Sequence, residues 1–180
     1  MITPDSMVEL RFRRMRLDDV EQVYAIDVLS FALPWSERSY RFELTENQNS
    51  HAWVAEALDG QGRSQVVGMI VMWIILDEAH IATIAILPEF RRMHIGRGLL
   101  ARALEDAVQS GATQAYLEVR RSNLAAQNMY HQFGFEVNGV RPRYYLDNGE
   151  DALLMMLHPI QVENFRQYGG LKPPDDENPA

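Results

Sequence analysis

A turn rich in arginine and glycine separates an apolar stretch at residues 80–87 from a run with helical spacing. It belongs to a group of four arginines within twelve residues of an otherwise acidic chain: Arg91, Arg92, Arg97 and Arg102. Where a strand ends in a turn and a helix begins, several backbone N–H groups lack partners and point the same way. Together with the positive end of the helix dipole, these groups bind phosphate oxygens. The turn therefore predicts a site for a phosphate-bearing ligand.

An ordinary charged helix start is the alternative interpretation of these arginines. Cations at the N-terminus of a helix oppose its dipole, however, by about 0.3–1 kcal/mol each. A bound anion removes that conflict, so the phosphate interpretation is favoured.

The composition limits the partners and the chemistry that are open to this chain. Its 17 basic and 25 acidic residues give a net charge of −8 and a pI near 5.1, which argues against non-specific nucleic-acid binding. The absence of cysteine excludes disulfides, thiolate catalysis and cysteine-based metal sites. No metal is expected, because the five histidines show no metal-ligand spacing: His51, His80, His94, His131 and His158.

The hydrophobic periodicity predicts the strands and helices that position the turn. Val8, Leu10 and Phe12 alternate with charged residues, as in a half-buried strand, and apolar residues recur at helical spacing from Ile95 to Val108. Turn and capping residues mark the remaining boundaries. We expect strands at residues 8–13, 53–58, 66–76, 81–87, 115–120, 135–137 and 153–157, and helices at about 18–30, 36–46, 95–108 and 122–133.

This order of elements predicts one mixed sheet with helices on both faces, because that packing buries the apolar side of every element. At 180 residues the chain fits one domain, which we place at residues 1–158. Residues 159–180 form a C-terminal extension. We expect it to be flexible from about residue 169, where glycine, proline and aspartate leave few apolar groups.

The N-terminus and the hydropathy indicate a cytoplasmic protein. The first residues lack a basic start followed by an apolar run, so we expect no signal peptide, and Met7 is an alternative start. The longest apolar run, Met69 to Leu76, is far shorter than the roughly 20 residues of a membrane helix. We therefore expect no contact with a membrane.

Several short motifs lie around the turn and along the chain: Leu33-Pro34-Trp35-Ser36-Glu37, Leu76-Asp77-Glu78-Ala79, Ile84-Ala85-Ile86 with Pro88 and the Arg91–Gly96 loop, Leu117-Glu118-Val119-Arg120 with Ser122-Asn123, Tyr130 with Phe133-Gly134-Phe135, Tyr144-Tyr145, and Gly149-Glu150-Asp151-Ala152. In combination they resemble the GCN5-related N-acetyltransferase (GNAT) superfamily, and within it the bacterial ribosomal-protein-alanine N-acetyltransferases of the RimI type. The resemblance covers roughly residues 8–157. It implies an α/β fold, with a mixed, mostly antiparallel central sheet between two helical layers.

The resemblance also implies that acetyl-CoA is the cosubstrate and that the turn holds its diphosphate. The superfamily pattern falls on Arg91, His94 and Gly96, and His94 stands where glycine is usual. Histidine tolerates a left-handed backbone better than most residues, so we expect the turn to form. For Asn123 a plain helix cap is a compatible alternative. The residues implied to bind the cofactor are Ile84, Ala85, Ile86, Arg91, Arg92, Met93, His94, Ile95, Gly96, Arg97 and Asn123.

Acetyl transfer to an amine requires a base for the amine and an acid for the leaving thiolate. The resemblance assigns the first role to Glu118 and the second to Tyr130. An α-amine with a pKa near 7.7–8.0 needs only mild help from a carboxylate. The alternatives are an ion pair of Glu118 with Arg120 or Arg97, and simple packing of Tyr130 between a helix and the sheet.

The acceptor side is implied to include Leu33, Trp35, Tyr144 and Tyr145, with an acidic rim at Asp77 and Glu78. Core packing of the tryptophan and strand pairing of the tyrosines are the alternatives.

The function that these residues predict is direct transfer of an acetyl group from acetyl-CoA to the α-amine of a protein. By resemblance, the acceptor is the N-terminal alanine of a small-subunit ribosomal protein. Two alternatives remain open, namely acetylation of a small-molecule amine and a non-catalytic acyl-CoA-binding module with a regulatory role. No direct nucleic-acid partner is expected.

Overall fold

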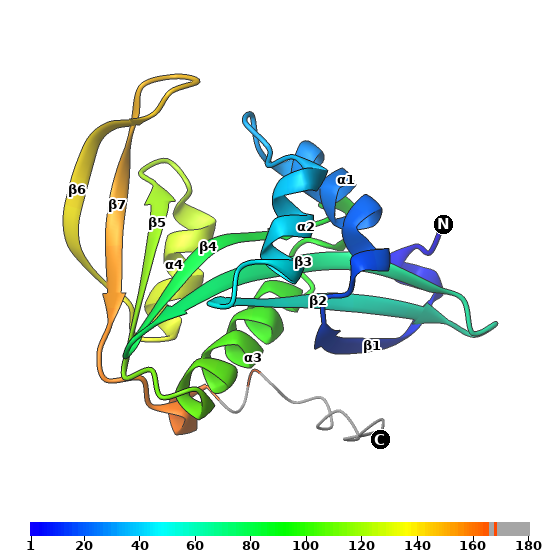
Figure 1. Ribbon diagram of the computed structural model, residues 1–180. Coiled ribbons are helices and arrows are strands. Elements are labelled where there is room, and N and C mark those ends of the chain that lie inside the picture. Colours follow the sequence, from blue (N-terminus) through cyan, green and yellow to red (C-terminus); the bar gives the residue numbers. More distant parts are fainter. Residues whose placement is uncertain (166–167, 169–180) are drawn as a thin grey trace.

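The computed structural model describes residues 1–165 and residue 168. Within these residues the framework is a seven-stranded sheet with the order β1-β2-β3-β4-β5-β7-β6 (Figure 1). Its strands are β1 (Met7–Arg14), β2 (Ser50–Asp59), β3 (Ser64–Ile75), β4 (Glu78–Ile86), β5 (Gln114–Arg120), β6 (Glu136–Tyr145) and β7 (Glu150–Leu157). Neighbouring strands are antiparallel except β4 and β5, which are parallel.

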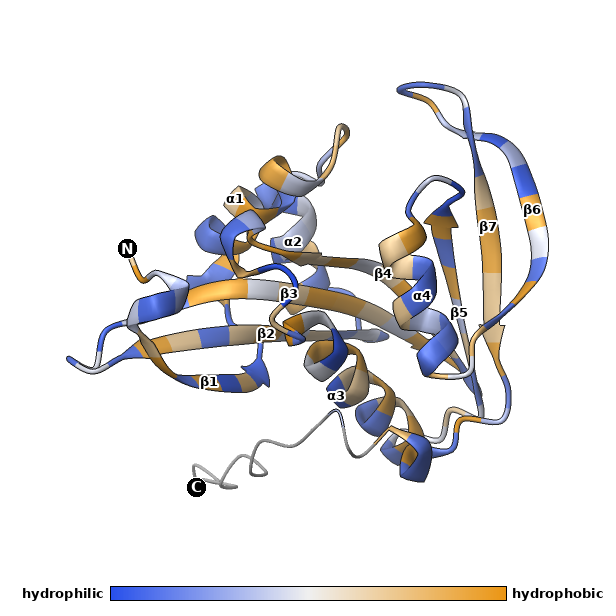
Figure 2. Cartoon of the chain, turned by 180° about the vertical axis from the view of Figure 1, so that it is seen from behind, coloured by the Kyte–Doolittle hydropathy of each residue, from blue (hydrophilic) through white to orange (hydrophobic). Residues whose placement is uncertain are grey.

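Four α-helices in the described part of the chain cover the sheet: α1 (Val20–Ser30), α2 (Glu37–Thr45), α3 (Ile95–Gln109) and α4 (Leu124–Gln132). Helices α1 and α2 lie on one face, and α3 and α4 lie on the other (Figures 1 and 2). Helix α3 joins β4 to β5, as parallel neighbours require a crossover connection. The predicted mixed sheet with helices on both faces is confirmed.

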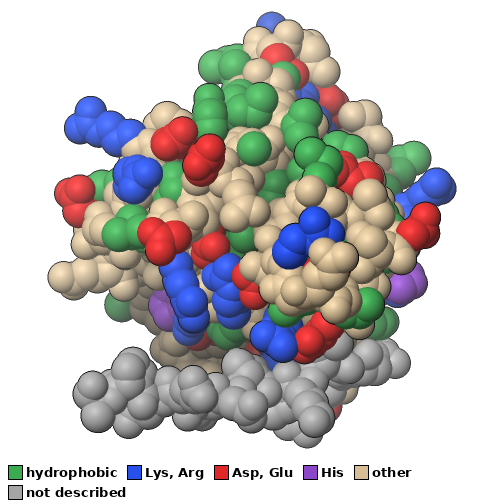
Figure 3. Space-filling view, turned by 90° about the vertical axis from the view of Figure 1, so that its right-hand side faces the viewer, with side chains coloured by type: hydrophobic (Ala, Val, Ile, Leu, Met, Phe, Trp, Pro, Cys, Tyr) green, Lys and Arg blue, Asp and Glu red, His purple; other side chains and the backbone are tan. Residues whose placement is uncertain are grey.

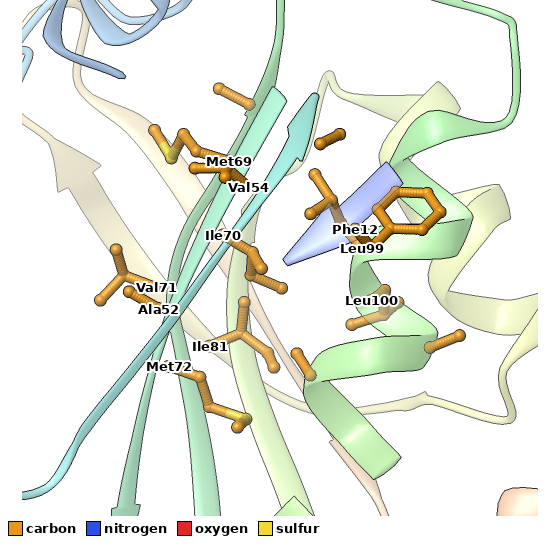
Figure 4. Close-up of a cluster of buried hydrophobic side chains, with 14 of the residues drawn as sticks. Phe12, Ala52, Val54, Met69, Ile70, Val71, Met72, Ile81, Leu99 and Leu100 are labelled. Carbon is orange, nitrogen blue, oxygen red and sulfur yellow. The ribbon is translucent and has the colours of Figure 1, made fainter. Parts of the chain in front are cut away.

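Buried apolar side chains fill both faces of the sheet, and those between the sheet and α3 include Phe12, Ile70, Leu99 and Leu100 (Figure 4). Leu99, Leu100 and Leu104 are fully buried on the side of α3 that faces the sheet. Complete burial of a leucine stabilises a fold by about 1.5–3 kcal/mol. Gly98 allows α3 to approach β1 closely, because a Cβ atom there would lie 2.1 Å from the ring of Phe12.

The helix boundaries follow the capping residues of the sequence. The Ser36 hydroxyl accepts a hydrogen bond from the backbone N–H of Ser39 at 3.1 Å, as expected at the start of α2. After α3 and α4 the chain turns through glycines with positive φ, Gly111 at 96° and Gly134 at 92°. Glycine adopts this conformation without steric cost.

The largest difference from the predicted elements is β6. The sequence predicts a strand only at residues 135–137, whereas β6 runs over ten residues to Tyr145. Gly139 and Pro142 argue against a strand interior, but β6 is the outermost strand, where proline is tolerated. The register between β6 and β7 shifts between Arg141 and Tyr145, which marks a bulge.

Part of the predicted C-terminal extension packs on the domain. The backbone N–H of Ile160 donates to the carbonyl of Thr113 at 3.0 Å. Phe165 is buried, with its ring 5.3 Å from that of Phe133. The flexibility predicted from about residue 169 lies outside the described residues.

Charged side chains of both signs occur together on the surface. Figure 3 shows acidic and basic groups interspersed on the face that is turned to the right in Figure 1. Over the described residues, every helix is too short or too polar to cross a membrane.

Candidate active site

The two parallel strands at the centre of the sheet separate along their length. Residues 78–81 of β4 pair with residues 114–117 of β5, and the pairing ends there. Beyond Ile81 and Leu117 the two strands leave an opening in the sheet. A groove of about 1430 Å³ occupies this region, and it is lined by residues of α1, β4, β5, α3, α4, β6 and β7. Pockets for a single small molecule are typically about 300–1,000 Å³, so this groove has room for two ligands.

The turn between β4 and α3 forms one end of the groove. Arg92 and His94 both adopt a left-handed conformation with φ of 63°, which turns the chain sharply before Ile95 enters the core. Within the described chain, the backbone N–H groups of residues 92–96 have no hydrogen-bond acceptor. These five groups, which we call the amide cradle, lie at the positive end of the α3 dipole and suit a phosphate group.

The arginines of the turn have different surroundings. The Arg91 side chain donates from Nε to the carbonyl of Ile86 at 3.1 Å and from Nη2 to the hydroxyl of Ser30 at 3.3 Å. It therefore ties the turn to β4 and to the end of α1. The guanidinium of Arg97 lies 5.5 Å from the ring centroid of Tyr168. Arg91, Arg92 and Arg97 all line the groove.

Glu118 points into the groove from β5, where it pairs with an arginine that the sequence did not single out. Its Oε1 atom lies 2.7 Å from Nη1 of Arg141 on β6, and its side chain is 28% exposed. The hydroxyl of Tyr144 donates to the same carboxylate, which raises the pKa of Tyr144. The suggested partner Arg120 instead pairs with Asp147 and Glu150.

Tyr130 lines the same groove from α4. It is buried, and this burial raises the pKa of its hydroxyl well above the ordinary value, with a smaller contribution from Tyr145. Burial also raises the pKa of Tyr145 to about 12. Tyr130 therefore keeps its proton at neutral pH and is available as a proton donor.

The loop after α1 also lines the groove. Trp35 stacks on Trp73 of β3 with ring centroids 6.3 Å apart, and its backbone N–H donates to the Asp27 carboxylate at 2.6 Å. Asp27 is buried, which raises the pKa of its carboxyl. Leu33 is 64% exposed at the edge of the groove.

Most of the predicted site residues lie together around this groove: Leu33, Trp35, Ile84, Ala85, Ile86, Arg91, Arg92, His94, Ile95, Gly96, Arg97, Glu118, Asn123, Tyr130, Tyr144 and Tyr145. Asn123 also caps α4, because its side chain accepts the backbone N–H of Ala126 at 3.1 Å. Both interpretations of Asn123 are therefore compatible with its position.

Three predicted site residues are absent from the groove lining, namely Met93, Asp77 and Glu78. Asp77 accepts backbone and hydroxyl hydrogen bonds from Thr113. Glu78 contacts Nε2 of His80 at 2.9 Å. Asp77 thus ties the β3–β4 turn to the residue before β5, and Glu78 accepts a hydrogen bond from the side-chain amide of Gln114 on β5 at 3.5 Å.

Sequence reasoning missed three groove residues that bear on chemistry. Arg141 lies between Gly139 and Pro142, two residues that disfavour a strand interior, so the predicted strand ended before it. Asp27 carries a usable signal, an acid among the apolar positions of a predicted helix. Trp73 lies within a long apolar strand, where nothing separates it from ordinary core residues.

The described residues hold no group of three or more histidine and acidic side chains that could bind a metal ion. The groove itself presents a carboxylate, a phenol and backbone N–H donors. This set suits acyl transfer, in which a base, an acid and an anion-binding group act on one bond.

Comparisons with known proteins agree with this chemistry. A family model described as the acetyltransferase (GNAT) family matches residues 20–135. A Bacillus subtilis protein, provisionally named as a ribosomal protein bS18-alanine N-acetyltransferase, is 43% identical over 143 residues, covering 79% of this chain and 91% of the relative.

One curated relative and one crystal structure from Escherichia coli also match this chain over nearly their full length. The ribosomal protein bS18-alanine N-acetyltransferase of that organism is 30% identical over 155 residues, covering 80% of this chain and 93% of the relative. The crystal structure of the ribosomal-protein-S18-alanine N-acetyltransferase from Escherichia coli superposes on this chain with a TM-score of 0.74. The two chains are 29% identical, and the match covers 85% of this chain and 95% of that chain.

Proposed function

This chain belongs to the acetyltransferase (GNAT) family, and we propose that it transfers acetyl from acetyl-CoA to the N-terminal alanine of a small-subunit ribosomal protein. One observation carries the proposal: residues 92 and 94–96 of the amide cradle, Glu118 and Tyr130 line a single groove large enough for two ligands. The names of the Bacillus subtilis and Escherichia coli relatives support the acceptor. A ribosomal acceptor implies that the reaction takes place in the cytoplasm.

The groove fits the cofactor by the chemistry of its donors. The amide cradle at residues 92–96 would hold the diphosphate, with Arg92 and His94 nearby to add charge or hydrogen bonds. The edge of β4 at residues 84–86 faces the opening in the sheet and would hold the pantetheine arm through backbone groups. Bound there, acetyl-CoA supplies an activated acyl group on a thiol that leaves readily.

Two side chains then move the protons of the reaction. The Glu118 carboxylate accepts a proton from the acceptor's α-amine, directly or through one water molecule. Tyr130 donates the proton that the leaving thiolate requires, since burial keeps its hydroxyl protonated. A backbone N–H of residues 84–86 stabilises the negative charge that develops on the carbonyl oxygen, as donors of this kind do in other acyl transfers.

The surroundings of Glu118 favour a small N-terminal residue with a peptide behind it. Trp35 and Tyr144 contribute aromatic surface to the groove lining, and Leu33 adds an exposed apolar edge. Rigid aromatic side chains leave a small methyl-bearing residue better placed than a bulky one. The rest of the acceptor then extends over the edge of the groove.

A panel of acceptors tests this function. The chain is mixed with acetyl-CoA and with peptides that begin with alanine, with other residues or with a blocked amine, and with free polyamines. Mass spectrometry locates the acetyl group. We expect turnover on alanine-starting peptides with acetylation at the α-amine. Turnover on free amines alone, or cofactor binding without any turnover, would contradict the proposal.

A further inference from the structure

An ion pair in the groove joins Glu118 to Arg141, and no role for that arginine follows from the proposed function. The pair spans 2.7 Å between Oε1 and Nη1, and the Arg141 side chain is 55% exposed. The guanidinium also lies 5.5 Å from the ring centroid of Tyr144, whose hydroxyl donates to Glu118. Glu118, Arg141 and Tyr144 thus form one cluster at the site of proton transfer.

A bulge in β6 aims these side chains at Glu118. Arg141 pairs with Ala152 and Tyr145 pairs with Glu150, so the three residues 142–144 of β6 lie opposite the single residue Asp151 of β7. Arg143 has a φ of 52° at the centre of this bulge, and its backbone N–H donates to the Asp151 carboxylate at 3.0 Å. In a regular strand, residues three apart point to opposite faces. Bulges commonly re-aim side chains beside active sites.

An isolated carboxylate is a poor partner for an amine that must react as a nucleophile. It stabilises the ammonium form through charge attraction, and the ammonium form has no free electron pair. A guanidinium on the same carboxylate offsets that attraction, since the pair has no net charge. The carboxylate remains a hydrogen-bond acceptor that can still take up a proton.

We propose that Arg141 is a positioning residue for acetyl transfer, which orients Glu118 and keeps the acceptor's α-amine in its neutral, nucleophilic form. This inference rests on the proposed function. It concerns the acceptor side of the groove and makes no use of the amide cradle.

The other charged groups around Glu118 are already neutralised within the described chain. Arg120, two residues along β5, is held by Asp147 and Glu150 at 2.8 and 3.3 Å. His80 on β4 contacts Glu78 and stacks on Tyr116 with ring centroids 5.3 Å apart. The remaining titratable groups that line the groove from α1, β5, α4 and β6 are Asp27, Tyr116, Tyr130, Tyr144 and Tyr145.

The test is the pH dependence of the acetyl-transfer step. Single-turnover rates on an alanine-starting peptide, with saturating acetyl-CoA, are measured from about pH 6 to about pH 9.5, the range in which an α-amine titrates. The variants are Arg141→Met, which keeps the aliphatic packing on Tyr144, and Arg141→Lys, which keeps the charge. Arg143→Met is the matched control, because it removes a charge from the same bulge without touching Glu118.

For Arg141→Met we expect the acidic limb of the rate profile to move up by about one pH unit, the effect of one nearby charge at a partly exposed site. The rate then falls about tenfold at pH 7 and recovers at high pH. Arg141→Lys retains most of the wild-type profile, and Arg143→Met retains all of it.

Two results would overturn the inference alone: an unchanged profile in Arg141→Met, or a uniform loss of rate at every pH. A shift of the same size in Arg143→Met would also overturn it, since the effect would then be general electrostatics. If the wild-type chain acetylates none of the peptides, the proposed function fails and this inference fails with it.

Discussion

Replacing Glu118 by glutamine removes the proposed base and keeps the shape of the side chain. General base catalysis contributes about 10²–10⁴-fold to a rate. An α-amine with a pKa near 7.7–8.0 is already neutral in roughly one molecule in eight at pH 7. The contribution of the base to the rate is therefore expected at the low end of that range, and we expect Glu118→Gln to lower kcat by about 100-fold.

The same substitution has little effect on the fold. The lost ion pair with Arg141 is partly exposed, since the side chains are 28% and 55% exposed. Such pairs contribute about 0–1 kcal/mol, which corresponds to a fall in Tm of at most about 2–4 °C for a chain of this size. A loss of activity in Glu118→Gln is thus separable from unfolding.

Steady-state acetylation of an alanine-starting peptide, calorimetric titration with coenzyme A and thermal unfolding form the assay. Coenzyme A affinity should stay within about twofold, since the amide cradle is on another element. Glu9→Gln is the matched control, because Glu9 pairs with Arg11 at 2.8 Å far from the groove, on β1. A Glu118→Gln variant as active as wild type at neutral pH would refute the base assignment.

Three further substitutions test other parts of the account. Tyr130→Phe should lower kcat by at least about tenfold, and full activity of this variant would rule out the acid role of Tyr130. In the wild-type rate profile no alkaline limb should arise from Tyr130, because its raised pKa keeps the hydroxyl protonated beyond the assay range. His94→Val should weaken coenzyme A binding in calorimetry, because a β-branched residue does not readily adopt a φ of 63°. His94→Gly should bind coenzyme A at least as well as wild type. Equal affinities for both variants would contradict the left-handed conformation at residue 94. Gly98→Ala should destabilise the fold by about 1–3 kcal/mol, because the added methyl group overlaps the ring of Phe12. The second substitution Phe12→Leu should partly restore the Tm. An unchanged Tm in the single variant would contradict the close packing of α3 on β1.

Sequence reasoning recovered the parts of the fold that depend on local pattern. The spacing of apolar residues in α3 reflects which side of the helix is buried, and the alternation in β1 does the same for Leu10 and Phe12. The predicted alternation fails at Val8, which is exposed where the register of β1 against β2 shifts. The resemblance placed His94 where glycine is usual, and its φ of 63° is a conformation that histidine tolerates better than most residues.

Features that depend on distant partners were not recovered. The length of β6 depends on its place at the edge of the sheet, which allows Pro142 within a strand. The pairing of Glu118 with Arg141 depends on a bulge and on a strand that follows 16 residues later in the sequence. Asp77 and Glu78, predicted as an acidic rim of the acceptor side, lie outside the groove lining and make hydrogen bonds to Thr113 and His80.

The central claim is that one groove holds both substrates, with the diphosphate at residues 92–96 and the acceptor amine beside Glu118. A crystal structure of the chain with coenzyme A and an alanine-starting peptide tests it most directly. The account predicts diphosphate oxygens within hydrogen-bond distance of the backbone N–H groups of residues 92–96, the thiol near Tyr130 and the peptide α-amine near Glu118. A diphosphate bound elsewhere on the protein, or a peptide whose N-terminus lies outside the groove, would contradict it.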